Sequence, residues 1–439
     1  MAEGFKRQLT RNVIVGTAVV AGLVAWIEAP LLFPALGVML AVWLIGTRTG
    51  RQSLAIARTG LSTIPQRWGA TSVIIVGIGG VVGVLIALLA MAEGFQATLR
   101  QAGSDDTAIV LRAGANAELS SGIDRATATL VSQAAGILRD KDGAPVASTE
   151  VVVVANLPKR STGTNANVEV RGVGPRVWEV RPNVRIIAGR RFRPGLRELV
   201  VGSGALAQFQ GLGLGATVRL NNQEWRVVGV FESGDAHDSE LWGDNESVAS
   251  AYRRSAFQSV TVRLVGPLSF DRFKAAINAD PRSKVDVDTT RAYYNKQSER
   301  LTRTIRVLGT GVAIIMAIGA VFGALNTMYA AVAARSREIA TLRALGFTGP
   351  PVVVAILLES MLLALLGGAL GAGVAYVLFN GYTVSTLGSN FSQVVFQFQV
   401  RPGLLLRGLE WALSIGFVGG LFPAVRAAAL PVTVALREQ

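Results

Sequence analysis

The sequence predicts an α-helical polytopic membrane protein with four core spans, an N-terminal hairpin and a large extracytoplasmic α/β domain in two lobes. Three observations predict this class. The 439-residue chain is 50% hydrophobic, with 49 glycines and a mean hydropathy of +0.42, so it is too apolar for an ordinary soluble protein. Several uncharged stretches reach the roughly 20 residues that cross a bilayer. Residues 94–303 combine strand-like and helix-like patterns and are numerous enough to bury a core of their own.

Four stretches have the length and composition of core spans. Residues 70–92 and 307–334 contain no charged side chain, and residues 351–379 contain only Glu359. The stretch 404–425 is weaker, because Arg407 and Glu410 lie near one end. These four stretches predict a multi-pass protein in contact with membrane lipid.

The N-terminus holds two shorter apolar runs. Lys6, Arg7 and Arg11 precede residues 12–27, and Pro30 separates that run from residues 31–46. This pattern favours a hairpin with two spans. A re-entrant or interfacial hairpin and a cleaved leader are the alternatives.

Basic residues in short loops set the expected orientation. Three segments are rich in arginine: the segment before the core spans (Arg48, Arg51, Arg58 and Arg67), the loop after residue 334 (Arg335, Arg337 and Arg343) and the C-terminal tail (Arg426 and Arg437). If the spans alternate in direction, all three segments lie on the same side of the membrane. That side is expected to be cytoplasmic, which places residues 94–303 outside.

Residues 94–303 show strand and helix patterns in turn. Six β-branched runs bounded by turn residues predict strands at 149–155, 168–173, 198–201, 217–220, 225–231 and 259–264. Helical spacing predicts helices at 121–138 and 270–279. We expect a β-rich lobe at about 189–254 inside a larger α/β lobe, with residues 90–102 and 290–306 extending the adjoining spans as stalk helices.

Several function classes have little support in the residues. Cytoplasmic loops explain the part of the net charge of +14 that lies outside residues 94–303, and no basic run with interleaved aromatics predicts nucleic-acid binding. With no cysteine, thiol catalysis and disulfides are excluded. The sole histidine, His237, lies among loop carboxylates, and we expect a solvated loop or an inter-subunit contact rather than a metal ligand. No catalytic arrangement, metal site or bound cofactor is predicted.

The cytoplasmic loop at 335–350 is the main candidate site. Its residues combine charge, in Arg337, Glu338 and Arg343, with apolar side chains three residues apart, in Ile339, Leu342 and Leu345, and Gly346 can end a helix. Such a segment can dock in a groove of a partner protein. A plain positively charged loop with an amphipathic turn is the alternative.

Polar and small residues inside the spans have structural readings. Glu359 is costly in lipid, so we expect it near the cytoplasmic interface, paired with a base such as Arg335 or Arg426; a proton or substrate site is the alternative. Each core span has a pair of glycines four residues apart, which lets helix backbones approach closely: Gly79 and Gly83, Gly319 and Gly323, Gly367 and Gly371, Gly416 and Gly420. Close packing within the subunit is favoured over a dimer seam.

Several motifs resemble one family. The run from Ser336 to Gly346 reads SREIATLRALG, and it is followed by Glu359 and by LLGGALG at 365–371. These resemble the REIG-x-LRALG, E and GG-x-LG signature of MacB/FtsX-type ABC permeases, and RWG at 67–69 resembles that family's entry to its first core span. Pro423 and Arg426, in FPAVRAA at 422–428, and PVTVALR at 431–437 resemble the family's C-terminal ending. GRRF at 189–192, ELVVG at 198–202 and WRVVGVF at 225–231 resemble its MacB-type periplasmic core domain.

The departures from the family pattern define the expected subtype. The N-terminal hairpin is outside it, and Ala340 replaces the glycine of REIG. No G-x-x-x-x-G-K-[ST] motif occurs, so the chain resembles split members whose ATPase is a separate polypeptide. The resemblance covers about residues 50–439.

The resemblance implies a function and its partners. The chain would be a homodimeric permease in the bacterial inner membrane, joined to two copies of an ABC ATPase that holds ATP and Mg²⁺. The Arg337–Gly346 segment would transmit ATP-driven closure to the periplasmic domain (mechanotransmission), for export through a periplasmic adaptor and an outer-membrane channel. An FtsX-like scaffold that activates a cell-wall hydrolase, a lipoprotein-release permease and a self-contained membrane receptor are the alternatives.

The expected division of the chain follows from these assignments. Residues 1–47 form the membrane hairpin, and 48–93 the basic entry helix and first core span. Residues 94–303 form the periplasmic core domain with its stalk helices. Residues 304–439 hold three core spans and the coupling segment.

Overall fold

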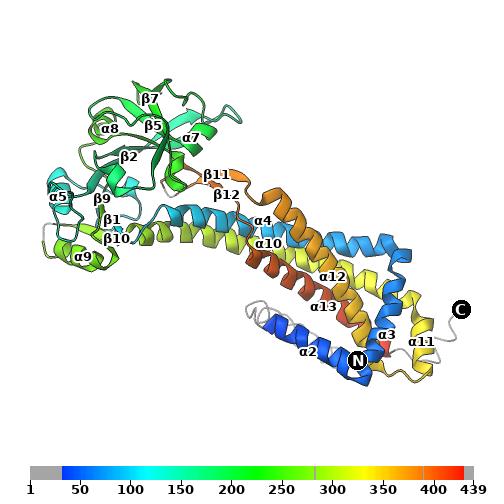
Figure 1. The fold of residues 1–439 in the computed structure, drawn as a ribbon. Helices are drawn as coiled ribbons and strands as arrows, with labels where there is room; N and C mark the ends of the chain where they lie inside the picture. The colour runs from blue at the N-terminus through cyan, green and yellow to red at the C-terminus, as the bar shows by residue number, and fades with distance from the viewer. Residues whose placement is uncertain (1–31, 281–282, 389, 430–439) are drawn as a thin grey trace, which may run out of the picture. The chain divides into compact units, whose positions relative to one another are not determined.

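The computed structural model describes residues 32–280, 283–388 and 390–429. The chain divides into two compact units that interleave along the sequence. We call them the helical unit, Met1–Ala90, Ile305–Asn380 and Gln399–Gln439, and the sheet unit, Met91–Thr304 and Gly381–Phe398. Two long helices contribute to both units, α4 (Trp68–Gln101) and α10 (Thr290–Ala334) (Figure 1). The chain therefore passes between the units four times.

The helical unit holds the predicted spans. Besides parts of α4 and α10 it contains α2 (Leu32–Gly46), α3 (Arg48–Ser62), the 3-10 turn η1 (Ile64–Arg67), α11 (Ser336–Ala344), α12 (Gly349–Phe379) and α13 (Pro402–Ala429). Among the described residues, four helices are long and apolar enough to cross a membrane: Thr71–Gln101, Thr290–Ala334, Gly349–Phe379 and Pro402–Ala429. The prediction of four core spans is confirmed.

The second arm of the predicted N-terminal hairpin is α2, which has 15 residues. The first arm, at 12–27, lies outside the described residues. Thr47 caps the start of α3 through its side-chain oxygen, which accepts a hydrogen bond from the Gly50 amide at 2.9 Å. α3 is amphipathic, and its buried face consists of Gly50, Ser53, Ile56, Ala57 and Gly60.

The sheet unit is built on one ten-stranded mixed sheet. The strand order is β10-β1-β9-β2-β3-β8-β5-β7-β4, with β6 paired to β7. Two pairs are parallel, β3 with β8 and β5 with β7, and the other pairs are antiparallel. The strands are β1 (Thr107–Arg112), β2 (Ala147–Pro158), β3 (Asn165–Val173), β4 (Arg185–Gly189), β5 (Glu198–Gly202), β6 (Thr217–Leu220), β7 (Gln223–Glu232), β8 (Glu240–Asp244), β9 (Ser259–Arg263) and β10 (Val285–Thr289).

Short helices and a separate hairpin complete the sheet unit. The helices are α5 (Arg125–Ser132), α6 (Val177–Val180), α7 (Ser203–Gln208), α8 (Asn245–Ala251) and α9 (Phe270–Asn278), with the 3-10 turns η2 (Glu118–Ser120), η3 (Ala236–Ser239) and η4 (Pro267–Ser269). The hairpin pairs β11 (Thr383–Leu387) with β12 (Gln393–Gln397). It follows α12 and precedes α13, yet it belongs to the sheet unit.

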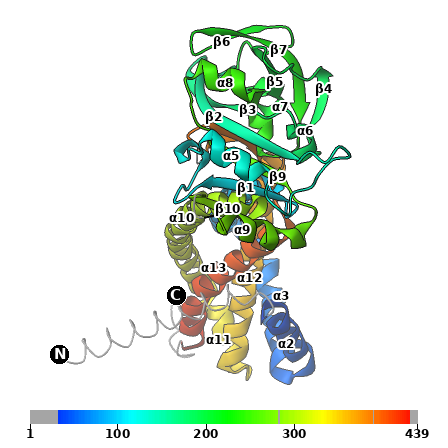
Figure 2. The same ribbon diagram turned by 90° about the vertical axis from the view of Figure 1, so that its left-hand side faces the viewer.

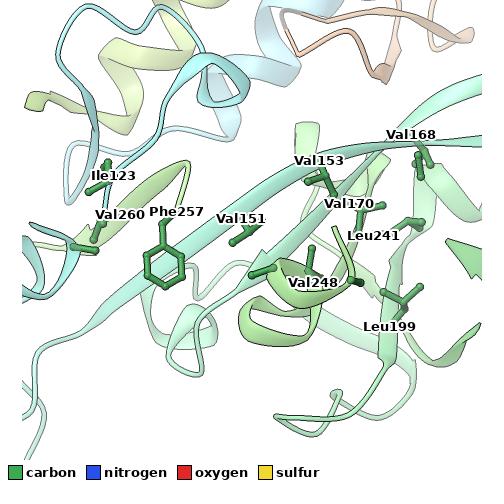
Figure 3. Close-up of a cluster of buried hydrophobic side chains, with 14 of the residues drawn as sticks. Ile123, Val151, Val153, Val168, Val170, Leu199, Leu241, Val248, Phe257 and Val260 are labelled. Carbon is green, nitrogen blue, oxygen red and sulfur yellow. The ribbon is translucent and has the colours of Figure 1, made fainter. Parts of the chain in front are cut away.

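Alternation along the strands sends different side chains to the two faces of the sheet. In β3, Val168 and Val170 join the larger apolar core, whereas Val173 joins the smaller one on the opposite face. The larger core also takes Val151 and Val153 of β2, and Figure 3 shows these valines along the two paired strands. Glu169 and Arg171 alternate with the valines, so they share the face of Val173.

Two lobes are visible in the sheet unit. Figure 2 shows β1, β9 and β10 grouped with α5 and α9, and β5 and β7 grouped with α7 and α8. The long strand β2 joins them, because it pairs with β9 near its start and with β3 along the rest. The β-rich lobe is wider than the predicted 189–254, since β3 pairs in parallel with β8. Long-range pairing of this kind is not encoded in local composition.

Most predicted elements of the sheet unit are present, with two differences. All six predicted strands form, as does the helix at 270–279. The helix expected at 121–138 is only Arg125–Ser132. Asp124 caps its start, because the Asp124 carboxylate accepts a hydrogen bond from the Thr127 amide at 2.9 Å. Gly136 has a φ of +97°, which a helix cannot contain. The hairpin at 383–397 was not predicted, because it lies between the predicted spans at 351–379 and 404–425.

Candidate functional site

The predicted coupling segment forms α11, a nine-residue helix directly after the long helix α10. Arg337 and Glu338 are exposed on its first turn, and Arg343 is half-buried near its end. Leu345, just past the helix, is 74% exposed. The segment therefore presents charged groups and one large apolar side chain together.

The predicted apolar face of this helix is divided between two roles. Ile339 and Ala340 are buried inside the subunit, and Leu342 is half-buried. Ile339 lines a small gap between helices with Ile56 of α3 and Val352 of α12. The expectation that Ile339, Leu342 and Leu345 form one partner-binding face is therefore wrong for Ile339. Its side chain anchors α11 to the neighbouring helices, which fixes the direction in which the exposed residues point.

Gly346 ends the helix as the sequence predicts. Its φ is +98°. Glycine adopts this conformation readily, whereas for a residue with a side chain it is energetically unfavourable. The Gly346 amide donates to the Arg343 carbonyl at 3.1 Å, and the Phe347 amide donates to the Leu342 carbonyl at 3.2 Å. These two hydrogen bonds are the Schellman arrangement, which satisfies carbonyls that the helix end leaves without partners. The role of the segment in coupling stays a prediction.

Glu359 is the hub of an ion-pair cluster in the helical unit. Its Oε1 accepts a hydrogen bond from Arg67 Nη2 at 2.7 Å, and its Oε2 accepts one from Arg335 Nη1 at 3.1 Å. Arg335 also pairs with Glu338 at 3.3 Å. The expectation that Arg335 pairs with Glu359 is confirmed, whereas Arg67 was not anticipated. Arg426, the other suggested partner, instead stacks over the ring of Tyr329 at 5.6 Å.

This cluster joins four segments at the base of α11. Glu359 belongs to α12, Arg335 lies between α10 and α11, and Arg67 lies in the turn before α4. Gly60 of α3 packs directly against the pair, because a Cβ there would lie 2.7 Å from Glu359 Oε2. Since the side chain of Glu359 is 5% exposed, breaking its pairs would leave a buried charge at high cost. The cluster holds α11 in a fixed position relative to the helices beside it.

Three of the four glycine pairs lie where helices of the same subunit approach closely. A Cβ on Gly371 would collide with the Gly79 carbonyl, and one on Gly367 would lie 2.7 Å from the Ile75 carbonyl, so α12 packs against α4. Gly416 and Gly420 of α13 face α12 in the same way. A Cβ added to Gly319 or Gly323 of α10 would meet no described side chain and no neighbouring helix within 4 Å.

The C-terminal motif residues lie in α13. Pro423 is buried inside the helix, where its missing N–H leaves the Gly419 carbonyl without its helical partner. Gly419 in turn faces α10, because a Cβ there would lie 2.7 Å from the Cβ of Ala324. The family ending therefore lies at the contact between α13 and its neighbours.

A buried charge network, which sequence reasoning missed, lies on the smaller-core face of the sheet. Arg171 of β3 contacts four carboxylates, with its closest N–O distances to each between 2.6 and 2.9 Å: Glu118, Glu150, Glu169 and Glu240. Arg181 binds Glu150 as well, at 3.0 Å from Nη2 to Oε2. Every member of this network is less than 10% exposed. The signal in the sequence was the alternation of Glu169 and Arg171 with buried valines.

The network shifts the pKa values of its carboxyls in opposite directions. Burial raises the pKa of Glu150, but Arg181 and Arg171 outweigh it and lower the value to about 2. Burial and the neighbouring Glu240 raise the pKa of Glu169 to about 7, in spite of Arg171. Glu169 is therefore the carboxyl of this network whose charge changes near neutral pH.

His237 is buried at 1% exposure, so the expectation of a solvated loop is wrong. Its Nδ1 lies 2.7 Å from Asp235 Oδ1, and its Nε2 lies 3.2 Å from the Tyr294 hydroxyl. Burial lowers the pKa of His237, but the charges of Asp235 and Glu240 outweigh it and raise the pKa. Within the described ranges, no group of three or more His, Cys, Asp and Glu side chains is placed to hold a metal ion.

A cavity of about 450 Å³ in the sheet unit adjoins the charge network. One wall is formed by Phe95 and Leu99 of α4 and by Leu301 of α10, and another by the loop of the β11–β12 hairpin. Glu118, Glu169, Arg171 and Glu240 form the floor. The cavity therefore brings the ends of the two long helices, the hairpin and the buried charges to one place.

Two family models match the chain. Residues 71–280 match a MacB-like periplasmic core domain, and residues 310–432 match an FtsX-like permease C-terminal domain. The first match covers the first core span and most of the sheet unit. The second covers α10 from residue 310 onward, α11, α12 and α13.

Relatives carry the same assignment. The chain is 24% identical over 408 residues to the macrolide export ATP-binding/permease protein MacB of Escherichia coli, covering 89% of this chain and 61% of that protein. It is 26% identical over 303 residues to the MacB protein of Pasteurella multocida, covering 65% and 46%. It is 26% identical over 244 residues to the ABC transporter permease YknZ of Bacillus subtilis, covering 52% and 57%. The chain thus spans less than two thirds of these relatives.

A solved structure, the periplasmic region of MacB from Actinobacillus actinomycetemcomitans, aligns to 46% of this chain and 92% of that chain, at 15% identity and a TM-score of 0.32. The family assignment depends on the sequence matches. The two matches follow one another along the chain, and together they include most of the four helices long enough to span a membrane. The chain belongs to the MacB/FtsX-type permeases of ABC transporters, as a membrane protein with an extracytoplasmic α/β domain.

Proposed function

We propose that this chain is a permease subunit that couples ATP hydrolysis by a separate ABC ATPase to motion of its extracytoplasmic domain. The ATPase would bind ATP and Mg²⁺ and would contact α11 on the cytoplasmic face of the bacterial inner membrane. The extracytoplasmic domain would lie in the periplasm and act mechanically on its substrate. No catalytic role is assigned to this chain.

The main support for this proposal is the way in which α11 is held against the neighbouring helices. Its buried residues, Ile339 and Ala340, and the Glu359 cluster fix it to α3, α10 and α12. Arg337 and Glu338 on its first turn, and Leu345 just past its end, remain exposed. A rigidly mounted helix with an exposed charged and apolar surface can transmit displacement, because force on it reaches the long helices without being lost in loop motion.

We further propose that two copies of the chain act together. In the most apolar 18-residue window of α10, 17% of the residues are buried, against 50% in each of the other three candidate spans. Ile315 and Phe322 of α10 are 72% and 66% exposed. Lipid alone could cover this surface, but the open glycines Gly319 and Gly323 also allow a second helix to approach closely.

Export is the use we favour for this motion. Substrate would be passed from the periplasm or outer leaflet to a periplasmic adaptor and an outer-membrane channel. A signalling scaffold that activates a wall hydrolase would use the same coupling. The identity of the bound partner, an adaptor or a hydrolase, distinguishes export from signalling. The lipoprotein-release alternative requires a lipoprotein-binding chaperone instead.

The test is purification of the full chain from its native membrane with identification of bound proteins and an ATPase assay. We expect an ABC ATPase to co-purify, and we expect Glu338→Lys with Arg343→Glu to reduce its recovery at least tenfold. A loss of that size corresponds to about 1.4 kcal/mol of binding free energy. An adaptor in the same eluate supports export, whereas a wall hydrolase supports signalling.

The matched control exchanges an ion pair of the sheet unit, whereas α11 belongs to the helical unit. Arg125 and Glu246 form an exposed pair in the sheet unit, at 2.6 Å. Arg125→Glu with Glu246→Arg reverses two charges as the test variant does, yet it should leave ATPase recovery unchanged. If no ATPase is recovered with the unmodified chain in mild detergent, the proposed function is wrong.

A further inference from the structure

The β11–β12 hairpin connects the two units by a route other than α4 and α10. It lies between α12, which ends at Phe379, and α13, which begins at Pro402, so only a few residues on each side separate it from these helices. Nevertheless it packs as part of the sheet unit. Any motion of α12 and α13 relative to the sheet unit must therefore move this hairpin or detach it.

Several hydrogen bonds hold the hairpin against the rest of the sheet unit. Gln208 of α7 donates to Ser385 Oγ at 2.7 Å, and the Val395 amide donates to Ser239 Oγ at 2.8 Å. Asn167 of β3 donates to the Phe391 carbonyl at 2.8 Å. Phe391 has a φ of +55°, a costly conformation for a residue with a large side chain. Phe391 is thus held in a particular backbone conformation where it contacts β3.

The hairpin loop also binds a member of the buried charge network. Oε2 of Glu169 accepts hydrogen bonds from Asn390 Nδ2 and Ser392 Oγ, each at 3.1 Å. Its other oxygen accepts a hydrogen bond from Arg171 Nη2 at 2.6 Å. Asn390 and Ser392 are themselves buried. Glu169 is consequently the residue through which the hairpin meets the network.

The charges that face Glu169 do not balance. On β3 the neighbour is Arg171, on β8 it is Glu240, and the turn before α5 contributes Glu118. Tyr294 and Arg300 of α10 line the adjoining cavity, whereas the α4 residues in that lining, Phe95 and Leu99, are apolar. Four carboxylates share Arg171, and Arg181 provides one further positive charge at Glu150. An ionised Glu169 therefore adds a negative charge to a buried site that already has an excess.

We propose that Glu169, Asn390 and Ser392 form a protonation-sensitive clasp that fastens the β11–β12 hairpin to the sheet unit. Glu169 is a positioning residue, because it acts through the hairpin on α12 and α13. The importance of the clasp for transport rests on the proposed coupling function. Its existence does not.

The direction of the effect follows from burial. While the hairpin covers Glu169, burial and Glu240 hold its pKa at about 7, against an ordinary value of 4.5. Release of the hairpin admits water and lets the pKa fall, although it also removes the Asn390 hydrogen bond. Because the fastened state has the higher pKa, it binds the proton more tightly. Fastening is therefore strongest at acidic pH and weakens as the pH rises from about 4.5 to about 7.

The size of the effect follows from the same linkage. If Glu169 returns to its ordinary pKa on release, the fastening equilibrium weakens about tenfold between pH 6 and pH 8.5. His237 also has a raised pKa, and it lies in the same unit. A variant at Glu169 is needed to separate the two groups.

The chain has no cysteine, so two introduced thiols can carry spin labels without background. Leu387→Cys on the hairpin and Thr162→Cys in the β2–β3 loop are both at exposed positions. In the full-length chain, electron–electron distance measurements should give a narrow distribution at pH 6 and a broader one at pH 8.5. Glu169→Gln, which stays neutral, should give the narrow distribution at both pH values.

Two further variants complete the test. Asn390→Ala with Ser392→Ala removes both donors and should broaden the distribution at pH 6 as well. Glu246→Gln, at an exposed ion pair, should behave as the unmodified chain does. The proposal is wrong if the distance distribution of Glu169→Gln still changes with pH. It is also wrong if Asn390→Ala with Ser392→Ala leaves the distribution unchanged.

Its role in coupling is tested separately with the ATPase complex. A Cβ on Gly204 would lie 3.3 Å from the Cβ of Val395, close to the spacing of a disulfide, so Gly204→Cys with Val395→Cys can lock the hairpin. Glu169→Gln should remove part of the pH dependence of ATP hydrolysis, and we expect oxidation of the two cysteines to remove the same part. Reduction should restore it. If oxidation changes nothing, the clasp has no part in coupling. If no ATPase assembles, the proposed function fails while the spin-label result stands on its own.

Discussion

Residues that carry charge inside the sheet unit determine how its stability depends on pH. The sole histidine, His237, is buried between Asp235 and Tyr294, with its Nδ1 on the Asp235 carboxylate. Its pKa is raised above the ordinary value of 6.5, so the protonated ring is favoured in the folded state. The stabilisation is fully present below pH 6.5 and is lost as the pH rises through the raised pKa.

We predict that the His237 ring titrates above pH 6.5 in the folded chain. Because it is the only histidine, ¹⁵N-histidine NMR of the purified protein reports it without assignment. Asp235→Asn should bring the titration to 6.5 or below, since the Asp235 charge is the main cause that raises the pKa. Tyr294→Phe, which removes only the hydroxyl near Nε2, should change it much less. A midpoint below 6.5 in the unmodified chain would contradict the prediction.

Sequence reasoning reached some of these residues and missed others for a definite reason. Glu359 stood out because a carboxylate interrupts an apolar span, and Arg335 followed from the arginine-rich loop. Arg67 lies 292 positions from Glu359, and no local pattern connects them. Similarly, nothing local shows that Glu118, Glu150, Glu169 and Glu240 meet at Arg171. Such clusters depend on strand register and loop placement, which a single sequence does not reveal.

Elements were predicted best where their patterns are strong. The four apolar helices and the strands at 149–155 and 225–231 follow from continuous runs of branched and apolar residues. The hairpin at 383–397 also alternates, with Val384 and Val395 on opposite strands, but it is short and lies between two spans. Its two strands could have been recognised from this alternation around Gly388. Its assignment to the sheet unit could not, because that depends on contacts with residues such as Asn167 and Ser239.

At the scale of helix packing, Gly371 is predicted to be intolerant of any side chain. A Cβ there would collide with the Gly79 carbonyl of α4, so Gly371→Ala should force α4 and α12 apart and cost about 1–3 kcal/mol. Gly373, two residues further along the same helix, has no described atom within 4 Å of such a Cβ. Gly373→Ala should therefore be neutral or slightly stabilising, because alanine favours helix.

The measurement is thermal unfolding of the two variants and the parent, purified in the same detergent. A lower midpoint for Gly371→Ala only would agree with the packing seen here. Equal midpoints for the two variants would show that α4 and α12 do not depend on their close approach.

At the scale of the whole molecule, the exposed apolar surface of α10 predicts a defined assembly. Native mass spectrometry of the purified complex should show two copies of this chain with two copies of the ATPase. The reason is that α10 alone among the four candidate spans leaves most of its apolar window uncovered. A mass for one copy of this chain, or for this chain paired with a different permease, would contradict the homodimer proposal.

The division of the sheet unit between residues 91–304 and 381–398 has a consequence for biosynthesis. A ribosome delivers the first segment long before the second, with α10, α11 and α12 emerging in between. Until then the nascent domain lacks Asn390 and Ser392, the hairpin residues that hydrogen-bond Glu169. Final closure of the domain must wait for insertion of the third apolar helix. A fragment that ends at residue 304 would therefore represent a biosynthetic intermediate rather than the mature domain.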